Sequence, residues 1–268
     1  MAMKKRVYIV GEHHNVLREW CKYQGQGMHL LSFDYHIDFR PAFSSGIGSD
    51  PLKCENVEAA IIALAKNEHI DYAIRRGIIK KAFVFSYERY FGGGKVRVKL
   101  VPDSKAEEYA QAKIDDCFKR MGLPQECLRV ALCRNVNNRQ DGQIIIESQI
   151  VSFSKERHPL APVSDKLITS DDVLNSVLGE FNDNNFDWGN YIFDFDCDFI
   201  RDEEAMTHEH FETLKKIIRG AKVITIAREP DCCDSNVPFQ RVERWLTELV
   251  ENCGDKVEIE YDTFAGSH

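Results

Sequence analysis

The 268-residue sequence has no apolar run close to the roughly 20 residues that a membrane-spanning helix needs. Its N-terminus shows no signal-peptide h-region and no cleavage site. It also lacks a C-x-x-C pair, which argues against a structural zinc site. The nine cysteines are an odd number in a long chain, so we expect free thiols of a reducing compartment. These absences predict a cytoplasmic protein with no membrane partner.

Basic residues are fewer than acidic ones, with 35 Lys and Arg against 43 Asp and Glu, a formal net charge of −8. Because a nucleic-acid partner requires a basic face, we expect none. The 43% hydrophobic and 29% charged residues are typical of a globular protein. We find no internal repeat, low-complexity tract or long linker, so we expect one domain over residues 1–268. The sequence leaves the oligomeric state open.

Strand patterns alternate with helical patterns along the chain. The expected strands are Lys5–Val10, Met28–Phe33, Ala82–Tyr87, Lys95–Val101, Leu128–Cys133, Gln143–Phe153, Asn190–Phe195, Lys222–Ala227 and Val257–Tyr261. The expected helices are Asn15–Tyr23, Glu55–Arg76, Ser104–Arg120, Ser170–Phe181, Asp202–Arg219 and Pro238–Cys253. This alternation predicts an α/β three-layer sandwich, a mostly parallel sheet with helices on both faces. Residues 82–153 are the candidate for a β-rich insertion.

Polar clusters follow four of the expected strands. They are the segments Gly11–Asn15 (GEHHN), Asp34–Asp38 (DYHID), Asp194–Asp198 (DFDCD) and Arg228–Asp231 (REPD). In a parallel sheet, functional groups gather where the strands end at their carboxyl edge. Because side chains alternate along an extended chain, the period of two brings Asp34, His36 and Asp38 to one side, and likewise the three acids Asp194, Asp196 and Asp198.

Three acids that converge repel one another unless a cation neutralises them. The mixture of carboxylate and imidazole groups favours Mn²⁺, Fe²⁺ or Zn²⁺ over Ca²⁺, which prefers oxygen ligands alone. One ion needs fewer ligands than the chain offers, which favours two ions that share a bridging carboxylate. Taken alone, the segment Asp34–Asp38 could be a turn with an Asx cap, the Asp-x-Asp pattern is a weaker signal, and His13 and His14 could be partly exposed histidines without a role. All four at strand ends predict a metal centre.

The succession G-E-H-H-N, S-F-D-Y-H-I-D and F-D-F-D resembles the metal-binding signature of the ureohydrolase superfamily, which includes the arginases and agmatinases. The short chain and its forms E-H-H-N and E-P-D-C-C are most similar to the peptide arginases. These enzymes convert arginine side chains within a peptide to ornithine. The resemblance extends from Gly11 to Asp231 and leaves the middle third unmatched. It implies an arginase-like fold, two Mn²⁺ ions per chain and an arginine-containing precursor peptide as substrate.

The resemblance also implies roles for individual residues. One ion would be held by His14, Asp34, Asp38 and Asp194, and the other by Asp34, His36, Asp194 and Asp196. His14 is favoured over His13, which stands where the family usually has aspartate. Asp38 would hydrogen-bond the attacking water and pass its proton to the leaving amine, and Glu229 would pair with the guanidinium group. Asp198 has no family counterpart and is either a neighbour of the ligands or a loop acid.

Two departures bear on the substrate. Enzymes of free arginine carry a catalytic histidine in the loop after the second motif, but residues 41–52 contain none, and His158 is the candidate substitute. Arg40 replaces the asparagine that reads the α-carboxylate of free arginine, which makes it a candidate substrate-binding residue. We therefore expect a Mn²⁺-dependent hydrolase that converts peptidyl arginine to ornithine and urea.

Three alternatives stay open. The chain could act on a small free guanidino or formimino compound, or it could be a non-catalytic metal-binding relative used for protein interaction. It could also be an amide deacetylase, although the related single-zinc deacetylases lack a carboxylate at the place of Asp38. Urea release distinguishes hydrolysis of a guanidino compound from the other two, and acetate release marks the last.

Overall fold

The computed structural model describes residues 5–36, 38, 42, 56–86, 129–136, 145–152, 165–183, 186–208, 211–254 and 256–262. Its strands are β1 (Lys5–Val10), β2 (Met28–Asp34), β3 (Ile79–Ser86), β4 (Arg129–Val136), β5 (Ile145–Ser152), β6 (Tyr191–Asp196), β7 (Val223–Ala227) and β8 (Val257–Tyr261). Its α-helices are α1 (Leu17–Trp20), α2 (Val57–Ala63), α3 (His69–Arg75), α5 (Asp171–Asp183), α6 (Glu212–Gly220) and α7 (Phe239–Glu251). Short 3₁₀ helices are η1 (His13–Val16), η2 (Cys21–Tyr23), η4 (Asp165–Leu167), η5 (Cys197–Phe199) and η6 (Glu203–Met206).

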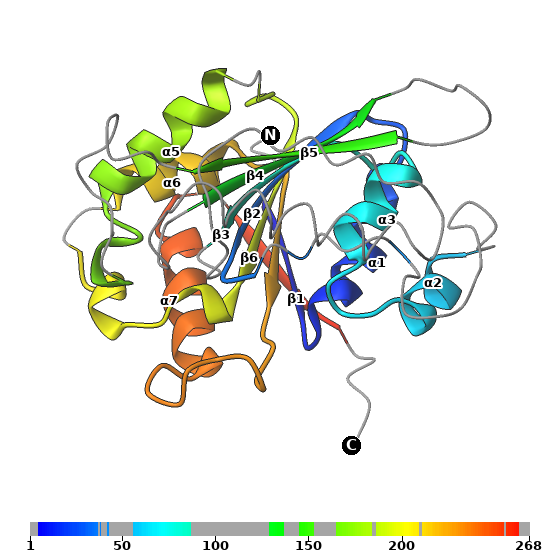
Figure 1. Cartoon of the computed structure of the whole chain (residues 1–268). Helices are drawn as coiled ribbons and strands as arrows, with labels where there is room; N and C mark the ends of the chain where they lie inside the picture. Colours follow the sequence, from blue (N-terminus) through cyan, green and yellow to red (C-terminus); the bar gives the residue numbers. More distant parts are fainter. Residues whose placement is uncertain are drawn as a thin grey trace, which may run out of the picture.

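All eight strands form one sheet in the order β5-β4-β3-β2-β6-β7-β1-β8. The six strands from β3 to β8 in this order pair in parallel, whereas β4 and β5 extend the sheet by antiparallel pairing. Figure 1 shows α1, α2 and α3 on one face of the sheet and α5, α6 and α7 on the other. The predicted α/β class and mostly parallel sheet are therefore confirmed, and the arrangement is that of a three-layer sandwich.

The central strands are apolar because helices cover both of their faces. All seven residues of β2 and all six of β6 are buried. Phe33 meets the ring of Phe193 edge-on at 5.3 Å, on the side that α5, α6 and α7 cover. Leu30 and Ile192 belong to the second core cluster, with the residues of α1 to α3. Polar side chains on β2 and β6 therefore stand out as exceptions to the apolar pattern.

Two expected helices are each interrupted. The expected helix Glu55–Arg76 is two helices, because Leu64 has an extended backbone and the Glu68 carboxylate accepts a hydrogen bond from the amide of Ala65 at 3.0 Å. This turn starts α3 at His69. Likewise Asp202–Arg219 divides into η6 and α6, with the Asp202 side chain capping η6.

The region 82–153 is expected to be a β-rich insertion, and its described strands join the main sheet. β3 is one of the parallel strands, and β4 and β5 continue the sheet beyond it. The expected strand Lys95–Val101 and helix Ser104–Arg120 lie outside the described residues. None of the helices that the structure describes combines the length and the apolar character that a membrane span requires.

The sheet order places the polar clusters next to one another. β2 pairs with β6, and β7 lies between β6 and β1, so four neighbouring strands end beside each other. Ser32 of β2 is the register partner of Asp194, and Asp194 in turn is the partner of Thr225 in β7. Asp34 and Asp196 lie two residues further along their strands, at the carboxyl edge itself.

Candidate metal centre

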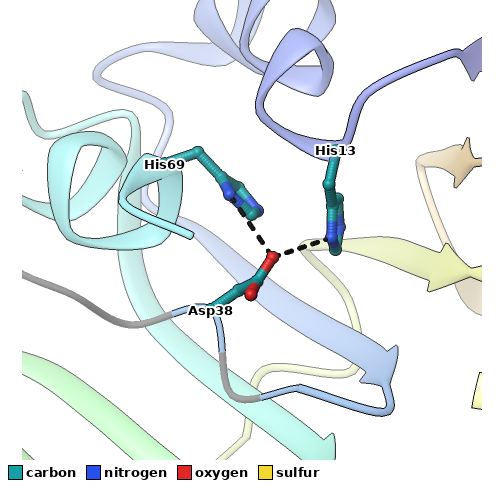
Figure 2. Close-up of side chains that lie close together, drawn as sticks. All are labelled: His13, Asp38 and His69. Atoms are coloured by element: carbon teal, nitrogen blue, oxygen red, sulfur yellow. Dashed lines mark ion pairs between the residues drawn. The ribbon is translucent and has the colours of Figure 1, made fainter. Parts of the chain in front are cut away.

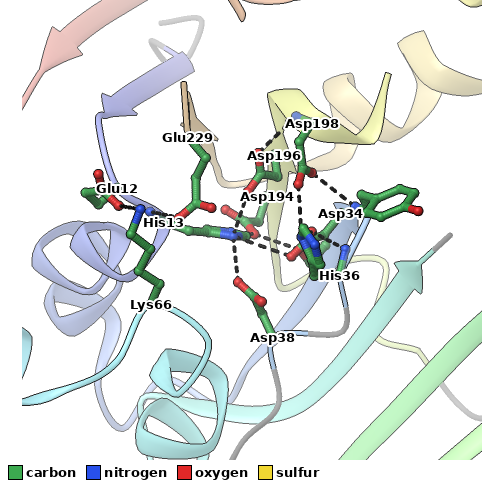
Figure 3. Close-up of polar contacts among 12 residues, drawn as sticks. Glu12, His13, Asp34, His36, Asp38, Lys66, Asp194, Asp196, Asp198 and Glu229 are labelled. Atoms are coloured by element: carbon green, nitrogen blue, oxygen red, sulfur yellow. Dashed lines mark hydrogen bonds and ion pairs between the residues drawn. The ribbon is translucent and has the colours of Figure 1, made fainter. Parts of the chain in front are cut away.

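Figure 3 shows one histidine surrounded by carboxylates from two strand ends. His13, the first residue of η1, is fully buried. Its Nδ1 lies 3.1 Å from Oδ2 of both Asp38 and Asp196, and 3.4 Å from Oδ2 of Asp34. Nδ1 has no hydrogen bond of good geometry to any described residue. This buried nitrogen and the three carboxylate oxygens together form a ligand set that suits a divalent cation.

The remaining nitrogen of His13 is held by Asp194. His13 Nε2 lies 2.8 Å from Oδ2 of Asp194, and that oxygen also accepts a hydrogen bond from the Ser32 hydroxyl at 2.7 Å. The Thr225 hydroxyl donates to the other oxygen of Asp194 at 2.6 Å. Both oxygens therefore have protein donors, as for a residue that orients a metal-binding histidine.

The contacts of Asp194 therefore do not favour the metal-bridging role that the resemblance implies for it. The physical reason is register: Asp194 lies level with Ser32 and Thr225, inside the sheet, whereas Asp196 lies at its edge. Among the described residues, the groups of side chains that could hold a metal ion contain Asp196 and Asp198 but not Asp194.

Asp34 also belongs to a second group of potential metal ligands. Asp34, His36 and Asp198 each offer a ligand atom, and these atoms lie within 4.8 Å of one another. His36 Nδ1 is 2.9 Å from Oδ2 of Asp198, and the backbone amide of His36 donates to Oδ1 of Asp34 at 2.7 Å. Asp198 is fully buried and accepts from the amide of Tyr35 at 3.3 Å. Asp198 is thus a member of the cluster that the period of two predicted, although it lies in η5 and not in an extended segment.

The carboxylates make this cluster strongly favour positive charge. Burial, and then the charges of Asp38 and Asp198, raise the pKa of Asp34 well above its ordinary value. Burial opposes protonation of His13, but Asp194, Asp196 and Asp38 still raise its pKa well above the usual range. The residues therefore fit a metal ion, because a cation would relieve the repulsion among buried acids.

Glu229 lies on the other side of His13. Its Oε1 accepts a hydrogen bond from the backbone amide of His13 at 3.0 Å, and its own amide donates to the carbonyl of Gly11 at 2.9 Å. The carboxylate is buried, yet the charge of His13, that backbone bond, the Cys232 thiol and Lys66 together lower its pKa. Glu229 is therefore an ionised carboxylate beside the cluster.

Two residues of this region have strained backbones. Asp38 has a φ of 46° and Glu229 a φ of 35°, and only Phe211 among the other described non-glycine residues has a positive φ. Such a conformation costs on the order of 1 kcal/mol or more for an L-residue. The occurrence of this conformation at Asp38 in the cluster and at Glu229 beside it is typical of a functional site.

Of the remaining predicted site residues, the structure describes His14 but not Arg40 or His158. Among the residues that the structure describes, no group of potential metal ligands contains His14. The contacts therefore favour His13 as the ligand, the reverse of the choice made from the resemblance. The two are adjacent in η1, so their side chains point in different directions, and only His13 is fully buried.

His69 is the residue that the sequence motifs missed. It is fully buried, and its ring centroid lies 4.4 Å from that of His13. His13, Asp38 and His69 form a third group whose potential ligand atoms lie within 4.8 Å of one another. Figure 2 shows the three side chains facing one another. His69 is not at a strand end and stands in an expected helix, so no motif indicated it. Its fully buried position at the start of α3 is visible only in the fold.

Comparisons of the chain with family models, with curated proteins and with solved structures found no match.

Proposed function

We propose that the chain is a Mn²⁺-dependent hydrolase that converts arginine residues within a peptide to ornithine and releases urea. The observation that carries the proposal is the position of Asp34, which belongs to two overlapping groups of potential ligands. A carboxylate shared in this way is what a two-ion centre requires. The reaction is inferred from the resemblance to the peptide arginases, and the buried acidic cluster would hold the metal ions that this reaction needs.

The ligand set would divide between two ions. His13, Asp38 and Asp196 would hold one ion, His36 and Asp198 would hold the other, and Asp34 would lie between them. Asp194 would keep His13 in the tautomer with a lone pair on Nδ1, since its carboxylate accepts from Nε2. When bound, two such ions supply a water molecule whose pKa is low enough for it to act as hydroxide near neutral pH.

Glu229 would position the substrate. A buried, ionised carboxylate forms a charge-assisted, paired contact with a planar guanidinium group. Its backbone contacts with Gly11 and His13 fix it relative to the metal ligands, so the guanidinium carbon would be held beside them. Asp38, which reaches the cluster from the segment after β2, would carry a proton to the amine that leaves as ornithine forms.

The peptide, rather than the free amino acid, is favoured by the sequence around the second motif. Arg40 replaces the amide that would read a free α-carboxylate, and residues 41–52 lack the histidine of the free-arginine enzymes. A residue inside a peptide has no free carboxylate, so an enzyme that acts on it depends on flanking contacts. Those remote contacts provide the binding energy that orients the reacting group.

The test is mass spectrometry of an arginine-containing peptide incubated with the protein and Mn²⁺. Each converted arginine loses about 42 Da, the mass balance of replacing the guanidino group by an amine with release of urea. Glu229→Gln is expected to lower turnover several-hundredfold, equivalent to about 3–4 kcal/mol, with Mn²⁺ content and melting temperature unchanged. Glu243→Gln is the matched control, because Glu243 pairs with the neighbouring Arg228 at 2.7 Å. It should keep turnover within a few-fold.

The outcomes separate the alternatives. Faster turnover of free arginine than of the same residue blocked at both ends would replace the peptide by a small substrate. Acetate release without urea would indicate a deacetylase. Two bound Mn²⁺ ions without any turnover would indicate a non-catalytic metal-binding protein, and no Mn²⁺ binding would overturn the proposal altogether.

A further inference from the structure

His69 enters the candidate metal centre from the helical layer rather than from a strand end. It is the first residue of α3, which covers one face of the sheet, and it is fully buried. Its ring lies against His13 at 4.4 Å with an interplanar angle of 44°, and against Trp20 at 5.5 Å. Nδ1 of His69 is 3.9 Å from Oδ2 of Asp38. Figure 2 shows His69, Asp38 and His13 converging from three separate segments.

The hydrogen bonds of His69 determine its tautomer. Nδ1 lies 2.9 Å from the carbonyl oxygen of Lys66. A carbonyl oxygen only accepts, so Nδ1 carries the hydrogen, and a neutral ring then has its lone pair on Nε2. Nε2 is buried and has no hydrogen-bond partner among the residues that the structure describes. A buried acceptor without a partner is costly, by about 1–3 kcal/mol, and requires an explanation.

We propose that His69 is a further ligand of the ion that His13 and Asp38 hold, an inference that rests on the metal centre of the proposed function. Proteins orient metal-binding histidines by letting the other ring N–H donate to a carbonyl or carboxylate, and the Lys66 carbonyl does this for His69. His13 has the same arrangement with Asp194. Both histidines thus have one ring nitrogen anchored by a protein acceptor and the other buried without a hydrogen bond to any described residue.

The spacing of the three groups agrees with this role. One ligand atom from each of His13, Asp38 and His69, with either ring nitrogen counted for a histidine, lies within 4.8 Å of the others. Ligands about 2.1 Å from one first-row ion lie up to about 4.2 Å apart, so a small side-chain adjustment closes the site. His69 would add a second imidazole to an ion otherwise held by one histidine and carboxylates, which favours Mn²⁺ or Zn²⁺ over Mg²⁺ or Ca²⁺.

Packing is the competing explanation, because the ring also fills space between Trp20 and His13. Two substitutions separate the roles. His69→Asn keeps a donor for the Lys66 carbonyl and loses the ring and Nε2, whereas His69→Phe keeps the ring and loses both nitrogens. His29→Asn is the matched control: His29 is also buried, but its Nδ1 accepts from the amide of Asp187 at the opposite end of β2.

The measurement is Mn²⁺ binding to metal-free full-length protein by isothermal titration calorimetry, with pulsed electron paramagnetic resonance to detect nitrogen ligands. If His69 is a ligand, both of its variants bind one of the two ions at least tenfold more weakly. Their Mn²⁺ spectra show less ¹⁴N modulation, while the melting temperature of metal-free His69→Asn shows that it is folded. His29→Asn should match the wild type in affinity and spectrum.

Unchanged affinity in either His69 variant would overturn the ligand role and leave a packing or hydrogen-bonding role, with the proposed function intact. Wild-type protein that binds no Mn²⁺ would overturn both the ligand role and the proposed function. Two ions bound by the wild type, with one weakened in both variants and not in the control, would establish the ligand.

Discussion

The two ends of β2 are equally buried and chemically opposite. At its amino end, His29 is packed against Phe83 at 6.1 Å and Phe186 at 5.5 Å, with one nitrogen bonded to a backbone amide. At its carboxyl end, Asp34 faces the carboxylates of Asp38 and Asp198. One strand thus joins an aromatic core to an acidic cluster within seven residues.

Burial alone does not decide the charge of a group in this protein. Burial lowers the pKa of His29 to about 4, with a smaller contribution from Lys81, so the ring is neutral near pH 7. For His13 burial acts in the same direction, but the surrounding carboxylates outweigh it and raise its pKa well above the ordinary value. The neighbours therefore distinguish a packing histidine from a histidine in a cation-binding cluster.

Asp34→Asn should give the largest effect at the acidic end. We expect Mn²⁺ affinity to fall more than a hundredfold and urea release more than a thousandfold, which is about 4 kcal/mol of transition-state stabilisation. The pKa of Asp34 is raised by burial and by neighbouring acids, so its ionised form opposes folding of the metal-free protein at pH 7. The variant in EDTA should therefore melt at the same or a higher temperature than the wild type.

Calorimetric titration and thermal melts in EDTA measure both halves of this prediction. His29→Asn at the other end of the strand should do the reverse, keeping Mn²⁺ affinity and losing stability. If Asp34→Asn binds two ions with wild-type affinity, or lowers the stability of the metal-free protein, then Asp34 has a structural role. The two ends of β2 would in that case not differ in function.

Strand placement and the polar clusters could be predicted from the sequence because both are local patterns. The strand Val257–Tyr261 is found with the predicted bounds, and β2 extends only one residue beyond its expected end. Asp198 also joins the cluster, although the family resemblance had set it aside. The period of two grouped it with Asp194 and Asp196, but the chain is not extended there, because Asp198 lies in the 3₁₀ helix η5 that the Asp196 side chain caps.

Register and helix breaks could not be predicted in this way, since they depend on partners far along the chain. Asp194 lies level with Ser32 and Thr225 only because β2 and β7 flank β6. A sequence pattern does not give that alignment, so it does not tell Asp194 from Asp196. The break at Leu64 similarly depends on the Glu68 carboxylate, and it is what places His69 against His13.

Substitutions of His13 and His14 should change Mn²⁺ affinity less than Asp34→Asn does, and they test which of the two histidines is the ligand. His13→Asn should weaken binding of one Mn²⁺ ion by about 10- to 100-fold, because it removes the nitrogen that faces three carboxylates. His14→Asn should change the affinity less than threefold, since His14 belongs to none of the groups of potential ligands among the described residues. Calorimetry of both variants under identical buffer conditions measures the difference. Equal losses, or a larger loss for His14, would restore the choice made from the resemblance.

The smallest expected effect is a pH dependence at the aromatic end of β2. His29 has a pKa of about 4 in the folded protein, against about 6.5 in an unfolded chain. Between these values the unfolded state binds more protons, so the contribution of His29 to stability is present above pH 6.5 and is lost as the pH falls toward 4. Between pH 7.5 and pH 5 this loss should be about 1–2 kcal/mol, allowing for partial solvent screening.

His29→Asn isolates that contribution, because the asparagine Oδ1 can accept from the Asp187 amide in place of the imidazole Nδ1 and does not titrate. At pH 7.5 the variant should be less stable than the wild type, since a smaller side chain leaves space beside Phe83 and Phe186. Urea unfolding in EDTA at both pH values should show this difference shrinking at pH 5, where only the wild type bears the cost of keeping a buried imidazole neutral. The acidic cluster titrates equally in both proteins and cancels in the comparison. A difference that is constant or grows with acid would mean that His29 is protonated in the fold and that the two ends of β2 are electrostatically alike.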